Sequence, residues 1–247
     1  MAATTSRSEP RPARPGLVRF DRTERLLHWA TALLFLVLLL TAALLYMAPL
    51  SAMVGRRGVV RLVHLWAGLA LPVPYLVARA GPWSRALRVD VARLARFDAT
   101  DSRWVRSLGR SRAVPLGKFH PLQKLNAAFT GGAIAVMLGT GAVMYWFEPF
   151  PLAWRTGATF VHDWLALALF GTIAVHIAKA VGDRDALGAM WHGRVTRRWA
   201  RDRHPLWADE MAGAALSRAQ PRHFPTRPHP VHRIGPHDAN RLRDPGP

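Results

Sequence analysis

Two histidines lie inside one apolar run of the chain, and their spacing suggests metal chemistry within a membrane. The run extends from Gly157 to Ala178 and has about the 20 residues that a helix needs to cross a bilayer. His162 and His176 are fourteen residues apart, so both leave the same helix face, roughly 21 Å apart along the axis. Ionisable groups inside a membrane are costly and usually functional, so one helix could supply an axial ligand to each of two haems. The alternative is that each histidine hydrogen-bonds a neighbouring helix.

The composition places these histidines in an integral membrane protein. Half of the 247 residues are hydrophobic, and they gather into four long runs. We expect membrane-spanning helices at about 26–47, 62–78, 125–147 and 157–178. Pro72 and Pro74 predict a kink in the second. The absence of cysteine excludes disulfides, covalent c-type haem and cysteine-bound iron–sulfur clusters from this chain, so any haem would be b-type.

The formal charge of +19 is distributed as a topology signal rather than as a nucleic-acid-binding surface. Lys and Arg number 6 in residues 1–25, 9 in 82–121 and 12 in 182–247, against 3 in 48–61 and 1 in 148–156. The positive-inside rule therefore predicts a multi-pass protein of the inner (cytoplasmic) membrane with both termini and the middle loop in the cytoplasm. The first apolar run is too long for a cleavable signal peptide and is expected to be retained.

Two further histidines lie near the ends of the first two spans. His28 is near the cytoplasmic end of the first span, and His64 is near the outer end of the second. By depth, His64 pairs with His162, and His28 pairs with His176. Two levels with two imidazoles each are what two bis-histidine b haems need. Taken alone, His28 could also be an interfacial residue.

The segments outside the spans are read as basic surface elements and tails. Residues 81–121 hold arginine-rich amphipathic stretches that suit short helices on the anionic inner leaflet, or a solvated loop that contacts a partner. Residues 183–216 are expected to form one or two short helices at the membrane surface. The membrane domain would then cover 17–216. Residues 1–16 and the Pro-, Arg- and His-rich residues 217–247 are expected to be disordered.

Several stretches together carry a family resemblance. They are RFDRTERLLHW, the pair His162 and His176, GKFHPLQKLN before the third span, and GRVTRRWARDRHPLWADE after the fourth. Over residues 17 to about 211 the chain resembles the cytochrome b (gamma) subunit of membrane-bound formate dehydrogenase. That subunit belongs to a wider group of bacterial b-type cytochromes, which includes those of nickel–iron hydrogenase and thiosulfate reductase. The stretch after the fourth span favours the formate dehydrogenase branch.

The resemblance implies a set of cofactors and partners. Two b haems would be bound, the outer by His64 and His162 and the inner by His28 and His176. A periplasmic arm with a molybdenum or tungsten catalytic subunit and an iron–sulfur subunit would supply electrons, and quinone would be reduced near the inner haem. The chain itself would carry no catalytic residue and no dehydrogenase activity alone.

One turn departs from the pattern of the resembling family. Where that family usually has Gly-Lys-(Tyr/Phe)-Asn-x-Gly-Gln-Lys, this chain has His120 and Leu122 in place of the Asn and Gly linked to quinone. The candidate quinone residues are thus His120, Leu122, Gln123 and Lys124. An imidazole at this position could hydrogen-bond a quinone carbonyl and also deliver a proton, with Lys118 and Lys124 lowering its pKa. The alternative is that His120 only caps the turn before Pro121.

These observations predict an all-α integral membrane protein, a four-transmembrane-helix bundle with short cytoplasmic or interfacial helices and disordered termini. Its expected function is to carry electrons from an outward-facing iron–sulfur subunit to membrane quinone. A hydrogenase, thiosulfate reductase or other respiratory oxidoreductase is an alternative electron donor. A haem-free anchor that holds soluble subunits at the membrane lipid is an alternative of a different class.

Overall fold

The structure is a computed structural model that describes residues 16–81, 85–107 and 114–219. The chain divides into two compact units, residues 1–212 and 213–247. The site and its supporting elements belong to the first unit. In the second unit, the described residues are the helical stretch that ends at Ala219. The rest of the predicted tail and nearly all of the predicted N-terminal lead lie outside the described residues.

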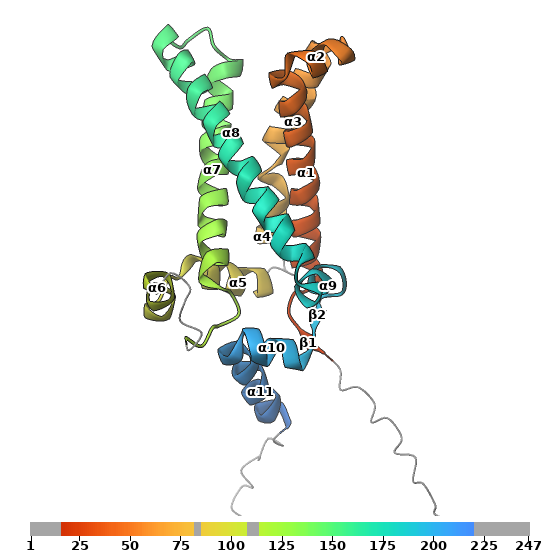
Figure 1. Ribbon diagram of the computed structural model, residues 1–247, viewed down its shortest axis with the longest axis vertical. Coiled ribbons are helices and arrows are strands. Elements are labelled where there is room, and N and C mark those ends of the chain that lie inside the picture. The colour runs from red at the N-terminus through yellow and green to blue at the C-terminus, as the bar shows by residue number, and fades with distance from the viewer. Residues whose placement is uncertain (1–15, 82–84, 108–113, 220–247) are drawn as a thin grey trace, which may run out of the picture. The chain divides into compact units, whose positions relative to one another are not determined.

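Within the described residues, four helical segments are long and apolar enough to cross a membrane. They are α1 (Arg22–Tyr46), α3 (Arg57–Ala70) continued by α4 (Val73–Ala80), α7 (Pro121–Tyr145) and α8 (Leu152–Val181). α1 packs against α3 and α4, and α7 packs against α8 (Figure 1). Many of their large apolar side chains are exposed, as a lipid-facing surface requires. The predicted all-α membrane fold is confirmed.

Local sequence signals set where the first two spans begin and bend. α1 begins at a capping box, in which the Asp21 carboxylate accepts from the Glu24 backbone N–H and the Glu24 carboxylate accepts from the Asp21 N–H, both at 2.8 Å. The second span breaks between α3 and α4, where Pro72 caps the new helix and Pro74 lies in its first turn. Neither proline can donate a backbone hydrogen bond, so the predicted kink is confirmed.

Short elements cover the two ends of the bundle. One end, named the hairpin end, has α2 (Ala48–Val54) after α1 and the turn between α7 and α8 (Figure 1). The other end, named the basic end, carries the remaining helices and two short strands. These are α5 (Arg85–Ala95), α6 (Ala99–Arg106), α9 (Arg184–His192), α10 (Arg197–Arg203), α11 (Pro205–Ala219), β1 (Leu17–Val18) and β2 (Arg194–Val195). The strands pair antiparallel, with Leu17 opposite Val195.

Within residues 182–219, the described part of the chain after α8, the structure has three helices, where the sequence predicts one or two for 183–216. Gly193 adopts a left-handed φ of 79° and ends α9, and Pro205 begins α11 directly after α10. A side chain at Gly193 would also place its Cβ 2.5 Å from the Phe20 carbonyl oxygen. The glycine therefore lets the chain turn tightly against the segment that leads into α1.

A small core at the basic end packs the segment that precedes α1 against the segment that follows α8. Its buried members are Ala189, Val195, Ala200, Trp207 and Ala208. Arg19, which is only 3% exposed, lies 4.7 Å from the Trp199 ring and 5.4 Å from the Trp207 ring, and donates to the Lys118 carbonyl oxygen at 2.9 Å. Burial lowers the pKa of Arg19 to about 10, against the opposing pull of Asp90 and Asp183. The guanidinium therefore stays charged at neutral pH and ties together the segments around it.

Candidate functional site

Two pairs of histidines face each other between the helices, and α8 contributes one member to each pair. Near the basic end, His28 of α1 lies opposite His176, with ring centres 6.1 Å apart. Near the hairpin end, His64 of α3 lies opposite His162, with ring centres 6.3 Å apart. These are the same two pairs that depth in the membrane predicts from the sequence. The fold thus brings together four residues that are spread over about 150 positions of the chain.

The spacing of both pairs suits one metal ion between each pair of imidazoles. A histidine nitrogen binds a metal at about 2 Å, and the ring centre lies roughly 1.1 Å further, so two opposed ligands have centres about 6.2 Å apart. In the part of the chain that the structure describes, no group of three or more His, Cys, Asp or Glu side chains could hold a bare metal ion. The remaining ligands must then come from a cofactor, as they do from the porphyrin of a haem.

The ring nitrogens of the hairpin-end pair are held by hydroxyl groups of neighbouring helices. Thr41 Oγ1 of α1 lies 2.8 Å from His64 Nδ1, and Thr140 Oγ1 of α7 lies 2.9 Å from His162 Nδ1. With Nδ1 engaged in this way, Nε2 remains as the nitrogen that can bind a metal. The chemistry of this donor set therefore fits an axially ligated haem.

A glycine of α7, Gly141, lies directly beside the His162 ring. A Cβ built on Gly141 of α7 would lie 3.5 Å from His162 Cε1, which is ordinary van der Waals contact. At Gly68, the added Cβ would instead meet Leu38 of α1 at 3.8 Å. Gly68 therefore lies where α3 packs on α1.

Aromatic and backbone contacts fix the basic-end pair relative to α9. Trp29, which follows His28, donates its Nε1–H to the Met190 carbonyl oxygen at 3.1 Å. Its ring centre lies 4.4 Å from that of Trp191. The Trp29 ring also meets the His28 ring edge-on, with centres 5.4 Å apart. α1 is thus fastened to α9 beside His28, which sets how this imidazole faces α8.

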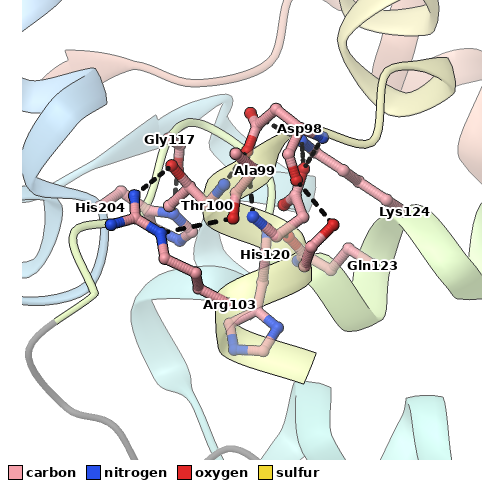
Figure 2. Close-up of polar contacts among 11 residues, drawn as sticks. Asp98, Ala99, Thr100, Arg103, Gly117, His120, Gln123, Lys124 and His204 are labelled. Carbon is pink, nitrogen blue, oxygen red and sulfur yellow. Dashed lines mark hydrogen bonds and ion pairs between the residues drawn. The ribbon is translucent and has the colours of Figure 1, made fainter. Parts of the chain in front are cut away.

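The His120 turn adopts the capping arrangement that was the alternative reading of this residue. His120 is the N-cap of α7: its Nδ1 accepts from the Leu122 N–H at 3.1 Å, and Gln123 Oε1 accepts from the His120 N–H at 2.9 Å. Figure 2 shows His120, Gln123 and Lys124 beside Asp98. The Trp104 ring of α6 meets the imidazole edge-on, with centres 4.4 Å apart. The free nitrogen of the capped ring is Nε2.

The two lysines expected to lower the pKa of His120 are instead paired with carboxylates. Lys118 is ion-paired with Asp90 of α5, and Lys124 with Asp101 of α6 at 2.5 Å. The pKa of His120 is lowered first by burial, then by Lys179 of α8, with Asp101 opposing. The lowered pKa of His120 agrees in direction with the sequence-based expectation, but its cause differs. Lys118 and Lys124 are each paired with a carboxylate, so they exert little net electrostatic effect on the imidazole.

Reasoning from the sequence missed the two threonines that hold the hairpin-end histidines. Thr41 interrupts the apolar run FLVLLLTAALL, and Thr140 lies in the apolar third span. The available signal was that each threonine lies inside an apolar span, at about the membrane depth of a histidine on a different span. That signal is weak, because a threonine in a membrane helix commonly bonds its own backbone.

Comparisons with known proteins agree with this architecture. A family model described as prokaryotic cytochrome b561 matches residues 19–193. The chain is 27% identical over 217 residues to the formate dehydrogenase cytochrome b556(fdo) subunit of Escherichia coli (strain K12), which covers 84% of this chain and 99% of that protein. It is 23% identical over 210 residues to the nitrate-inducible formate dehydrogenase cytochrome b556(Fdn) subunit of the same strain, covering 80% and 93%. The formate dehydrogenase cytochrome b556 subunit of Haemophilus influenzae is 24% identical over 206 residues, covering 78% and 83%.

The helical bundle with its paired histidines and these relatives define a multi-pass membrane cytochrome b. The chain belongs to the prokaryotic cytochrome b561 family. Haem b binding follows from that membership. The relatives named above are subunits of formate dehydrogenase, an oxidoreductase, and this places the chain among the membrane cytochromes of respiratory oxidoreductases.

Proposed function

We propose that this chain is the di-haem b-type cytochrome subunit of a formate dehydrogenase-like respiratory complex, and that it carries electrons from an iron–sulfur subunit to membrane quinone. The observation that carries the proposal is two pairs of facing imidazoles, with ring centres 6.1 Å and 6.3 Å apart. One continuous helix, α8, contributes one imidazole to each pair. A lone pair could be a packing contact between helices. Two pairs of near-equal spacing, fourteen residues apart on α8, support two equivalent ligand sites.

His28 and His176 would hold one haem near the basic end, and His64 and His162 the other near the hairpin end. A bound b haem supplies one-electron oxidation and reduction at its iron. The protein provides the ligands, an apolar surrounding and the separation. Fourteen residues along α8 correspond to roughly 21 Å, a large part of a hydrocarbon core about 30 Å thick.

The distribution of basic residues supports one orientation in the inner membrane. By the positive-inside rule, the basic end with α5, α6, α9 and α10 faces the cytoplasm, and the hairpin end with α2 faces the periplasm. The iron–sulfur subunit, which links the chain to a molybdenum or tungsten catalytic subunit, would then dock at the hairpin end. The names of the curated relatives support formate as the electron source.

A quinone would bind at the start of α7, beside the basic-end pair, with His120, Leu122, Gln123 and Lys124 as its candidate contacts. Since His120 Nδ1 accepts from the Leu122 N–H, the neutral ring carries its proton on Nε2. That N–H would donate to a quinone carbonyl, as an Asn amide could. Protonation of Nδ1 would break the cap, so the protons for quinol are better drawn from water than from this ring.

Haem content is the test that separates this proposal from a haem-free anchor. The purified complex, or the chain in isolated membranes, should show a b-type reduced-minus-oxidised spectrum and two haems per chain by the pyridine haemochrome assay. One haem or none in the parent chain would overturn the di-haem proposal. The subunits that co-purify with a tagged chain, and the electron donor they oxidise, would then separate formate from hydrogen or thiosulfate complexes.

A further inference from the structure

We propose that Thr41 and Thr140 are positioning residues for the hairpin-end haem, and that their hydroxyl groups lower its midpoint potential. This inference rests on the proposed function, because it takes His64 and His162 as axial ligands. Each threonine would fix the tautomer and the ring orientation of one ligand. Together they would make the hairpin-end site electronically different from the basic-end site.

The hydrogen-bond directions follow from counting hydrogens. A threonine hydroxyl has one hydrogen to donate. Thr41 Oγ1 lies 2.7 Å from the Val37 carbonyl oxygen, and Thr140 Oγ1 lies 2.8 Å from that of Val136. A carbonyl can only accept, so the hydroxyl hydrogen is used there. The contact with the imidazole must therefore be a bond in which Nδ1–H donates and the threonine oxygen accepts.

This direction leaves each imidazole prepared as a metal ligand. With Nδ1 protonated, the lone pair of the neutral ring is on Nε2, the nitrogen that remains to bind iron. Donation from Nδ1–H to an acceptor raises the basicity of the ligand nitrogen. A more basic ligand stabilises the oxidised iron, and the midpoint potential falls. Thr41, which is 7% exposed, makes its bond out of contact with water, where a hydrogen bond is stronger.

The two contacts arise independently on different helices. Thr41 of α1 reaches across to α3, and Thr140 of α7 reaches across to α8. Two threonines of α8 also donate to the backbone carbonyl oxygen four residues earlier. Thr159 donates to that of Arg155 at 3.0 Å, and Thr172 to that of Ala168 at 2.8 Å. Within the described residues, neither Thr159 nor Thr172 has a hydrogen bond to an imidazole. Backbone bonding alone therefore does not explain why two threonines meet the two hairpin-end histidines.

The basic-end pair lacks this arrangement. Within the described residues, the imidazoles of His28 and His176 have ring contacts but no hydrogen bond. The hydroxyl groups thus bias one site only. The threonines would therefore lower the midpoint potential of the hairpin-end haem and leave that of the basic-end haem unchanged. This difference favours electron movement from the hairpin end toward the basic end.

The test is a potentiometric titration of the haem spectrum in membranes that contain the full complex. The variants are Thr41→Val and Thr140→Val, which keep the side-chain volume but remove the acceptor, with Thr41→Ser and Thr140→Ser as rescue variants. Thr172→Val is the matched control, since it removes a hydroxyl with the same backbone bond. The hairpin-end haem is assigned as the component that disappears in His64→Ala.

We expect each valine variant to raise the midpoint potential of the hairpin-end haem. The serine variants and Thr172→Val should keep the parent value. Loss of that haem in a valine variant, with retention in the matching serine variant, supports the same role. An unchanged potential in both valine variants, or equal loss in valine and serine variants, would overturn the inference. A parent complex without two haems would overturn the proposed function itself.

Discussion

His204 Nδ1 lies 2.6 Å from the carbonyl oxygen of Gly117, so the residue that ends α10 is tied to the turn that precedes α7. Figure 2 shows this contact beside the His120 cap. A carbonyl can only accept, so Nδ1 donates and neutral His204 completes the bond. His204 is also only 5% exposed. This link joins two segments that are 87 residues apart in the chain, and both border the candidate quinone site.

Acid should destabilise the packing around His204, because protonation places a buried positive charge near Arg19, although Nδ1–H can still donate to the Gly117 carbonyl. Burial, helped by Arg19, lowers the pKa of His204 to about 4 from an ordinary value of 6.5. The folded state therefore binds this proton less readily than the unfolded state. Its stabilisation is fully present above about pH 6.5 and is lost as the pH falls toward 4, by at most about 3 kcal/mol. Hydrogen exchange of residues 199–211 in detergent, measured from pH 7 to 4, should show this loss.

The control for the acid prediction is His204→Gln, whose amide can still donate to the Gly117 carbonyl but does not titrate. Its exchange rates in residues 199–211 should follow the intrinsic pH dependence of exchange without an added step between pH 6.5 and 4. Equal acid sensitivity in the parent and in His204→Gln would show that another group controls this region.

Each histidine pair should bind its haem independently. His64→Ala should remove the hairpin-end haem and His28→Ala the basic-end haem, so that the haem-to-protein ratio falls from two to one in each variant. The physical reason is that one remaining imidazole leaves the iron without its second protein ligand. The pyridine haemochrome assay measures the ratio. His192→Ala, which alters an exposed histidine at the end of α9, should keep both haems.

Reporter fusions should place the two ends of the bundle on opposite sides of the membrane. A reporter after residue 247 should be active only in the cytoplasm, and one inserted after α2 only in the periplasm, as the basic residues predict. The opposite pattern would reverse which haem lies nearer the electron donor. A fusion after α4 serves as the internal reference, because the loop that follows should share the side of the C-terminus.

Replacement of His120 should separate its capping role from a role toward quinone. Asn is a strong N-cap and keeps an N–H donor, whereas Ala loses the cap at a cost of about 1 kcal/mol and loses the donor. We expect His120→Asn to retain quinol formation and His120→Ala to lose most of it, with haem content unchanged in both. Full quinone turnover in His120→Ala would exclude the residue from the site.

The pH profile of the same variants gives a second measurement. Burial and Lys179 lower the pKa of His120 below 6.5, so the neutral, capping ring dominates at neutral pH. As the pH falls through the lowered pKa, protonation opposes the Leu122 N–H and weakens the cap. Quinol formation by the parent should therefore decline at acidic pH, whereas His120→Asn should show a flatter profile between pH 5.5 and 8. Identical profiles would count against this role.

The sequence was sufficient for the features that depend on local composition. Long apolar runs located the four spans, and Pro72 and Pro74 located the break between α3 and α4. The pairing of His28 with His176 followed from membrane depth alone. In a membrane-spanning protein, the position of a residue along its span gives its depth in the bilayer, and a soluble protein offers no such information. α2 was missed, since seven residues in a loop give too short a pattern for a helical period.

The features that depend on how helices rotate about their axes were not available from the sequence. Thr41 reaches His64 only because α1 turns that face toward α3. Likewise, Lys124 meets Asp101 because α6 folds back beside the start of α7, and no local pattern encodes that approach. The ion pairs that neutralise these lysines, and hence the cause of the shifted pKa of His120, required the three-dimensional structure.

The position of His162 and His176 on one uninterrupted helix makes the protein tolerant of substitution but not of changes in length. The length of α8 between these residues fixes their separation and their relative angle about the helix axis. Each added or deleted residue would turn one imidazole by about 100° relative to the other. A single insertion there would aim one of the two side chains away from its partner helix, whereas most exchanges of one apolar residue for another would leave both in place. Related chains with this function should therefore vary in the composition of this stretch while keeping its length fixed.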